Sequence, residues 1–280
     1  MNPAKITILA PGLIGGSVAL AATQAFPKSK IAICTRRPES IPTIRTILPQ
    51  AEIGTSPSLA SHADLVLLGS PPSALPELVR AILPFLSPTT LVTDVSSFKE
   101  SVEKTIAPLL LGHARWIGSH PMAGSEHSGI SAARANLFHQ APVILTPTSA
   151  TSADTLHQAT SFWQTLGAHV LCMTPQDHDA QIARISHLPH LIATTLVLTA
   201  GSDSLPLAGS GYRDTTRVAS GPAPLWTEIL IGNQPELLAS LKTFRTTLDR
   251  VTSALENKDA STLSKLLDQA THIRRTLSSP

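Results

Sequence analysis

Short apolar runs alternate with helix-like segments from the N-terminus to about residue 174. The runs have the length and β-branched content of buried strands, at residues 6–9, 30–34, 63–70, 91–95, 116–119, 142–145 and 167–173. Between them, segments such as residues 15–25, 75–83 and 99–110 are predicted helices. Strands that alternate with helices at this spacing form a parallel sheet with helices on both faces. The pattern therefore predicts an α/β domain.

The pattern changes after about residue 174, where strand-like runs give way to helical periodicity. Apolar residues recur at helical spacing over residues 177–199, 235–255 and 261–277. We therefore predict two domains, an α/β domain over residues 1–174 and an all-helical domain over residues 175–280.

Composition narrows the class of protein. The chain has 280 residues, 42% of them hydrophobic, which is enough for a sizeable core. The net charge of +2 gives no general attraction for nucleic acid or for anionic membranes. Pro11-Gly12 and Gly15-Gly16 interrupt the apolar N-terminal run, so it predicts neither a signal peptide nor a membrane span. The two cysteines lie in apolar runs and favour a reducing compartment, which predicts a cytoplasmic protein.

A glycine turn follows the first predicted strand. The stretch APGLIG has the G-x-G-x-x-G spacing, with Ala10 at the first position, where a small residue is needed in a tight turn. In a Rossmann unit the second glycine, here Gly12, lets the backbone approach a pyrophosphate, and the third, here Gly15, lets the helix pack on the strand. We expect this turn, including Leu13 and Ile14, to bind a dinucleotide at the helix N-terminus. The predicted fold class of the first domain is a Rossmann-type, doubly wound, mostly parallel sheet.

The residues after the second predicted strand concern the choice of cofactor. Thr35 lies 20 residues after Gly15, where an Asp or Glu would bind the ribose 2′-hydroxyl of NAD. Arg36 and Arg37 follow at once, and guanidinium groups bond phosphate oxygens in a fork. We therefore predict that Thr35, Arg36 and Arg37 bind the 2′-phosphate of NADP, with NAD as the alternative cofactor.

Polar residues also follow later strands, at the sheet edge where a cofactor and a substrate meet. Ser70 ends the third run and Asp94 lies near the end of the fourth, so we expect both at the cofactor. Longer polar clusters are TDVSSFK at 93–99, GSHPMAGSEHSG at 118–129, ISHLPHL at 185–191 and GYRDTTRVASG at 211–221.

These clusters resemble the motifs of the prephenate and arogenate dehydrogenase family. The matching pieces, in family order, are GLIGGS at 12–17, the TDV-S-K loop at 93–99, HPMAGSE at 120–126, SHLPH at 186–190 and RDTTRVAS at 213–220, with Trp226 beyond them. The resemblance implies a dehydrogenase of tyrosine biosynthesis. Such an enzyme transfers a hydride from a cyclohexadienol to a nicotinamide, removes the hydroxyl proton and releases carbon dioxide as the ring becomes aromatic.

The resemblance also implies roles for individual residues. His120 matches the catalytic base, and Ser97 matches the serine that orients it and contacts the substrate hydroxyl. Ser96, beside it, stands where the family commonly has glycine. Arg217 matches the arginine that binds the substrate carboxylate, a task suited to a planar guanidinium. The other expected substrate-pocket residues are Ser125, Glu126, His187, His190 and Arg213.

Two of these assignments have alternatives. Arg213 is either a second clamp on the substrate or the ion-pair partner of an acid such as Asp214. His187 and His190 either line the pocket or are core histidines. Their spacing also resembles a metal pair, but no third ligand accompanies them and Pro189 lies between them, so no metal is predicted.

We therefore predict NADP-dependent oxidative decarboxylation of prephenate to 4-hydroxyphenylpyruvate, with arogenate, which would give tyrosine directly, as the alternative substrate. Two other classes remain open: another NADP-linked reductase of the same two-domain plan, and a protein that senses NADP without turnover. The resemblance further implies a homodimer that forms through the helical domain. Neither a nucleic acid nor a membrane is an expected partner.

Overall fold

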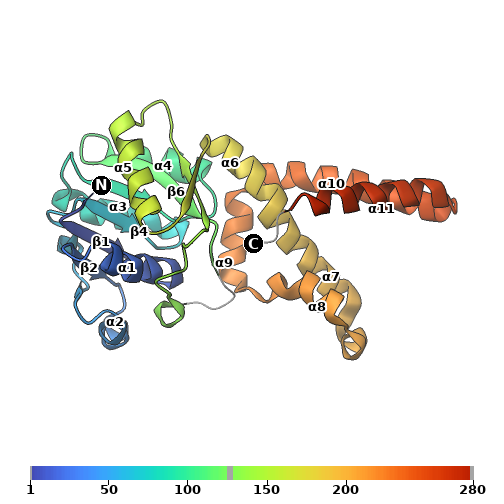
Figure 1. The fold of residues 1–280 in the computed structure, drawn as a ribbon, viewed down its shortest axis with the longest axis horizontal. Coiled ribbons are helices and arrows are strands. Elements are labelled where there is room, and N and C mark those ends of the chain that lie inside the picture. The colour runs from blue at the N-terminus through green and yellow to red at the C-terminus, as the bar shows by residue number, and fades with distance from the viewer. Residues whose placement is uncertain (1, 125–128, 278–280) are drawn as a thin grey trace. The chain divides into compact units, whose positions relative to one another are not determined.

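The structure, a computed structural model, describes residues 2–124 and 129–277 (Figure 1). It divides into two compact units, the first ending at Asn233 and the second beginning at Gln234. The first unit therefore contains the whole sheet together with the helices that follow it up to Asn233. The assignment of residues 1–174 and 175–280 to two domains stays a prediction.

An eight-stranded sheet forms the centre of the first unit, in the order β3-β2-β1-β4-β5-β6-β7-β8. The strands are β1 (Lys5–Leu9), β2 (Lys30–Cys34), β3 (Glu52–Gly54), β4 (Leu65–Leu68), β5 (Leu91–Asp94), β6 (Arg115–Pro121), β7 (Pro142–Thr146) and β8 (His169–Cys172). All neighbouring strands are parallel except β6 and β7, which are antiparallel. The predicted doubly wound, mostly parallel sheet is confirmed.

Alternate residues of the central strands face two hydrophobic cores, because successive side chains of a strand point to opposite faces. On one face, Ile8 and Leu67 pack with Phe162 and Trp163. That face is covered by α1 (Leu13–Ala25), α2 (Ile41–Ile47) and α5 (Ala153–Thr165). The other face is covered by α3 (Leu75–Ile82) and α4 (Glu100–Leu110). Burial on both faces explains why these strands are continuous apolar runs.

Strand β6 changes partner half-way along its length. Its first residues pair with β5, and this ladder ends where Thr93 lies opposite Ile117. Its last residues, Gly118 to Pro121, pair with β7 in the antiparallel direction. Strand β6 therefore runs beyond the end of β5, and its final residues lie at the edge of the sheet where parallel strands present their carboxyl ends.

Helices follow β8, as the sequence predicts. In the first unit they are α6 (Pro175–Ile182), α7 (Leu188–Ser204), α8 (Ser210–Thr216) and α9 (Ala223–Gly232), and Figure 1 shows α7 and α8 side by side. The side chain of Thr174 accepts a hydrogen bond from the N–H of Asp177 and begins α6. No helix in the described part of the chain is long and apolar enough to span a membrane.

The helix expected over residues 177–199 is interrupted by a π-helical turn, η6 (Ala183–His187), between α6 and α7. Pro189, at the start of α7, has no N–H to donate to the preceding turn, and a wider turn tolerates that loss. The interruption therefore has a local cause in the SHLPH sequence.

The second unit is a helical hairpin of α10 (Gln234–Glu256) and α11 (Ala260–Arg275), which contact each other. The carboxylate of Asp259 accepts the N–H of Thr262 and so begins α11. Large apolar side chains of this hairpin are exposed, namely Leu238, Leu248, Leu255, Leu267 and Ile273.

Candidate active site

His120 lies on the extended part of β6 and is 8% exposed. Its Nδ1 atom is 2.8 Å from Nε2 of His178, which lies in α6 and is fully buried. The two rings meet edge to face, with centroids 5.1 Å apart. The contact between His120 on β6 and His178 on α6 thus joins two histidines that are distant in the sequence.

His178 is held in turn by Asp179. Its Nδ1 atom is 2.7 Å from Oδ1 of Asp179. The same carboxylate accepts the backbone N–H groups of Lys99, at 2.7 Å, and of Glu100, at 2.9 Å. These are unpaired N–H groups at the start of α4, where a helix favours negative charge. These two N–H groups therefore hold the Asp179 carboxylate in the position from which it contacts His178.

These contacts determine where the protons of the two histidines lie. A carboxylate only accepts, so Nδ1 of His178 carries a hydrogen and its Nε2 has a lone pair. Nδ1 of His120 therefore donates to that lone pair, which leaves Nε2 of His120 unprotonated. Nε2 of His120 has no hydrogen-bond partner among the described residues. The chain Asp179–His178–His120 ends in a nitrogen that can accept a proton.

Electrostatics keeps this nitrogen unprotonated. Burial lowers the pKa of His120 well below 6.5, and the neighbouring His178, Lys99 and His187 lower it further. Burial also lowers the pKa of His178, although its hydrogen bond to Asp179 opposes that effect. His120 is therefore a neutral imidazole at neutral pH, as a general base must be.

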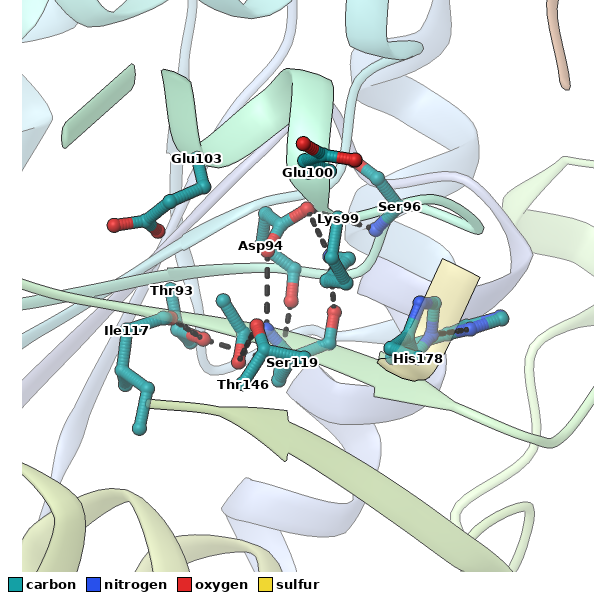
Figure 2. Close-up of polar contacts among 12 residues, drawn as sticks. Thr93, Asp94, Ser96, Lys99, Glu100, Glu103, Ile117, Ser119, Thr146 and His178 are labelled. Atoms are coloured by element: carbon teal, nitrogen blue, oxygen red, sulfur yellow. Dashed lines mark hydrogen bonds and ion pairs between the residues drawn. The ribbon is translucent and has the colours of Figure 1, made fainter. Parts of the chain in front are cut away.

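Asp94 and Lys99 form a buried ion pair beside this chain (Figure 2). The Lys99 Nζ atom lies 2.6 Å from Oδ2 of Asp94 and donates to the carbonyl of Ser119 at 2.7 Å. The carboxylate of Asp94 also accepts the N–H groups of Ser96, at 3.0 Å, and of Ser119, at 3.1 Å. The sequence predicts Asp94 at the cofactor; the structure places its carboxylate among donors of the protein, and contact with a cofactor stays a prediction.

Ser97 and Ser70 lie at the carboxyl ends of neighbouring strands. Ser97 is half-buried, and no hydrogen bond within the described residues joins it to His120, which His178 orients instead. The hydroxyls of Ser70 and Ser96 are buried and have no partner within the described ranges. Unpaired buried hydroxyls at this edge are available to a bound molecule.

The glycine turn has the geometry of a dinucleotide site. Gly12 begins α1 without a side-chain cap, and a β-carbon there would meet no protein atom within 4 Å. Leu13 and Ile14 form the first turn of α1. A β-carbon on Gly15 would lie 3.1 Å from Ile8 Cγ2, so that glycine serves helix packing. The open approach at Gly12 and the uncapped helix N-terminus fit a pyrophosphate.

Ala10, the first residue of the turn, has φ of 61°. An L-residue adopts this left-handed conformation at a cost, whereas glycine does not. Small size is therefore not the whole requirement at this position, and backbone freedom also matters there.

The loop after β2 is ordered by Thr35. The buried Thr35 hydroxyl accepts the N–H of Arg37 at 3.1 Å and lies 3.0 Å from the Ser40 hydroxyl. Arg36 and Arg37 are both exposed. The Thr35 hydroxyl therefore fixes the backbone of this exposed loop, which follows β2, the strand that pairs with β1.

His187 and His190 lie with Trp226 in the helical part of the first unit. The rings of His190 and Trp226 stack with centroids 3.5 Å apart, and the His187 ring meets Trp226 edge to face at 6.5 Å. Both histidines are buried, and Nε2 of His187 and Nδ1 of His190 have no partner within the described residues. Nδ1 of His187 lies 3.1 Å from the Asn233 amide, which also donates to the Asp179 carbonyl at 2.9 Å.

The other predicted substrate residues lie on or beside this cluster. Arg213 lies on α8 and Arg217 begins η8 (Arg217–Ser220); both side chains are exposed. The segment η8 packs against α7, which carries His190. Ser125 and Glu126 lie outside the described residues.

Sequence reasoning missed His178, Asp179, Asn233 and the role of Lys99. The signal available was an adjacent His-Asp pair in the first turns of a predicted helix, but helical periodicity alone gave that pair no function. No group of three or more His, Cys, Asp or Glu within the described ranges could hold a metal ion.

Comparison with known proteins decides the family. The model of the prephenate dehydrogenase nucleotide-binding domain matches residues 18–172, and that of the prephenate dehydrogenase dimerization domain matches residues 174–269. The chain belongs to the prephenate dehydrogenase family. A prephenate dehydrogenase of Bacillus subtilis is 32% identical, over 98% of this chain and 76% of that protein.

Solved structures of family members have the same fold. The prephenate dehydrogenase of Aquifex aeolicus, solved with hydroxyphenyl propionate and NAD+, has a TM-score of 0.91 at 28% identity and covers 98% of both chains. A Synechocystis arogenate dehydrogenase has a TM-score of 0.84 at 34% identity, over 97% of this chain and 99% of that one. The chain is thus an oxidoreductase of the prephenate dehydrogenase family, as its motifs predict.

Proposed function

We propose that the protein catalyses the NADP-dependent oxidative decarboxylation of prephenate to 4-hydroxyphenylpyruvate. The observation that carries the proposal is the hydrogen-bonded chain from Asp179 through His178 to Nδ1 of His120. It supplies an oriented, neutral base at the carboxyl edge of a dinucleotide-binding sheet, and that is the group this reaction requires.

The base acts on the ring hydroxyl of the substrate. Nε2 of His120 accepts the hydroxyl proton while a hydride leaves the carbon that bears this hydroxyl. When bound, NADP+ supplies the acceptor for that hydride. The C–O bond becomes a carbonyl, and the ring carboxylate then leaves as carbon dioxide. The electrons of the broken C–C bond pass through the ring, which becomes aromatic, onto the carbonyl oxygen, and this oxygen takes a proton back from His120 to form the phenol. The imidazolium of His120 is stabilised because its Nδ1–H donates to His178, which Asp179 holds.

Substrate binding is assigned to the polar groups of the helical segments. Arg217, at the start of η8, binds a carboxylate of the substrate, and Arg213, on the preceding helix α8, is a second cation for it. His187 and His190 offer buried nitrogens that have no partner among the described residues. Ser97, on the loop after β5, contacts the ring hydroxyl, and Ser125 and Glu126, which lie outside the described residues, are assigned to the substrate by their motif alone.

The preference for NADP rests on the loop after β2. No carboxylate stands at Thr35 to bind a ribose 2′-hydroxyl, and two guanidinium groups follow on a backbone that the Thr35 hydroxyl orders. Such a loop suits a 2′-phosphate. Gly12, Gly15 and the start of α1 hold the pyrophosphate, and Ser70, whose hydroxyl has no partner among the described residues, binds the cofactor. NAD is the alternative cofactor and the one bound in the Aquifex aeolicus structure.

Arogenate is the alternative substrate. The 34% identity of this chain to the Synechocystis arogenate dehydrogenase supports this alternative. Prephenate and arogenate differ only in a keto or an amino group on the side chain. The ring chemistry at His120 is therefore the same for both substrates, and the choice between them depends on pocket residues.

A homodimer is proposed for the functional state. Residues 174–269 match a dimerization domain, and α11 has no buried residue in the described chain. A two-helix hairpin with so many exposed leucines has little core of its own, so a second copy is the natural partner.

A steady-state assay of the purified protein tests the function. It measures the reduction of NADP and of NAD, each with prephenate and with arogenate as the substrate. We expect turnover with both substrates, because their ring chemistry is the same. Turnover should be fastest with NADP and prephenate. Turnover fastest with arogenate would assign that substrate instead. NADP binding without turnover in any of the four assays would overturn the proposal in favour of an NADP sensor or another reductase, which imine and hydroxyacid substrates would then distinguish.

A further inference from the structure

On the side of β5, the backbone of Ser119, the residue before His120, is bonded to side chains instead of to a strand, whereas on its other side it pairs with β7. The β5–β6 ladder ends two residues earlier, where Thr93 lies opposite Ile117. Beyond that point the N–H of Ser119 donates to Oδ1 of Asp94, and its carbonyl accepts from Nζ of Lys99 (Figure 2). The two side chains thus continue the pairing that β5 no longer provides.

These two side chains are an ion pair removed from water. The side chain of Lys99 is 1% exposed and that of Asp94 is 0% exposed. Burying two charges is costly, and apolar residues of similar volume are often equally stable or more so. Stability alone therefore gives no reason for an ion pair here, whereas a need for a fixed position does.

Lys99 also contacts the other side of the histidine chain. Its backbone N–H donates to Oδ1 of Asp179, the same oxygen that His178 contacts. One residue therefore binds the peptide next to His120 and the carboxylate next to His178. The 2.8 Å approach of the two rings lies between these two contacts.

The packing around Lys99 leaves little freedom for β6. A β-carbon on Gly118 would lie 2.6 Å from Thr146 Oγ1 and 3.3 Å from the Lys99 side chain. The strand is thus enclosed between β7 and the Lys99 side chain, directly before His120.

We propose that Lys99 and Asp94 are positioning residues for the reaction, which hold the Ser119 peptide so that His120 meets His178. This inference rests on the proposed function of His120 as the base. The charge of Lys99 also affects the pKa of His120. The titratable groups that act on His120 are His178, Lys99 and His187, and Lys99 is the cation among them that lowers the pKa of His120.

Two double variants separate position from charge. Asp94→Asn/Lys99→Met removes both charges and the donor to Ser119, whereas Asp94→Asn/Lys99→Gln removes the charges but keeps an N–H donor. Neither leaves a lone buried charge. We expect kcat to fall about 10- to 100-fold in the Met variant and to recover at least about threefold in the Gln variant. KM for the substrate should change less than about threefold in both. Lys104→Met, which removes an exposed lysine of the same helix, is the matched control.

The pH dependence gives a readout that a merely structural role would not move. Without the Lys99 charge the pKa of His120 rises, so the acid limb of kcat/KM should move to higher pH in both double variants. Titration of the His120 ring by NMR should show the same shift, and it needs no turnover. An inactive wild-type enzyme would overturn the proposed function, whereas the NMR shift tests the positioning pair separately. Wild-type kcat in the Met variant, an unmoved His120 titration, or failure of both double variants to fold would overturn the inference.

Discussion

Nδ1 of His120 lies 2.8 Å from Nε2 of His178. This contact joins a strand of the nucleotide-binding sheet to the first helix after the sheet. The base of the proposed reaction is therefore oriented by a residue from outside its own motif. In serine hydrolases a carboxylate holds the histidine directly, whereas here a second histidine lies between the base and Asp179.

Removing either histidine should affect turnover more than binding. We expect His120→Asn to lower kcat at least about 100-fold and His178→Asn to lower it about 10- to 100-fold, because the first loses the base and the second only its orientation. Dissociation constants of substrate and NADP should change little. His157→Asn, at an exposed position, is the control for each. A fully active His178→Asn enzyme would remove His178 from the mechanism.

The acid limb of the pH profile should lie below the ordinary histidine range. Burial lowers the pKa of His120 well below 6.5, and protonation at lower pH blocks its lone pair. We therefore expect kcat/KM, measured from initial rates, to stay constant as the pH falls through 6.5 and to decline only in more acidic solution. A midpoint at or above pH 6.5 would contradict the environment described for His120.

Cofactor choice should depend on the loop after β2. We expect Arg36→Ala and Arg37→Ala to weaken NADP binding by about 1.5–3 kcal/mol for each charge-assisted bond lost, while NAD binding changes little. The binding constants can be compared by titration with both cofactors. Arg45→Ala removes an exposed arginine of α2 and serves as the control. Equal losses for NADP and NAD would disprove recognition of the 2′-phosphate by this loop.

Stability should fall in mild acid because of His187. Its pKa is lowered from 6.5 to about 4, mainly by burial, so the unfolded chain binds a proton that the folded chain does not. The stabilisation is therefore complete above pH 6.5 and is lost between pH 6.5 and about 4, by on the order of 3 kcal/mol. Urea unfolding across this range should show a shallower pH dependence in His187→Gln. An identical pH dependence in the variant would show that other groups cause the loss.

Gly69 is required by the dinucleotide turn. A β-carbon there would lie 2.7 Å from the Ala10 carbonyl oxygen and 3.0 Å from that of Leu9, and these backbone atoms cannot move aside easily. We expect Gly69→Ala to lower the free energy of unfolding by about 1–3 kcal/mol and to weaken cofactor binding. Gly209→Ala, where a β-carbon meets nothing within 4 Å, should do neither. Unchanged unfolding and binding in Gly69→Ala would show that the turn adapts.

The sequence predicts the sheet well because strands buried on both faces are continuous apolar runs. Strand β3 escapes prediction since it has only three residues and contains Glu52 and Gly54. The motifs predict His120 as the base because such a role depends on residue type within a local sequence. The partners of His120 could not be predicted in the same way, because His178 approaches it only when α6 packs beside β6. Lys99 is visible in its motif, but its contact with Ser119 depends on where the β5–β6 ladder ends.

That ladder ending has a consequence for how the enzyme can change. Backbone pairing between two strands is nearly the same whatever side chains they carry, so point mutations seldom alter it. At Ser119 the pairing groups belong to Asp94 and Lys99, which are encoded residues. In the proposed mechanism, the placement of the base therefore depends on two side chains that single substitutions can change without altering the sheet.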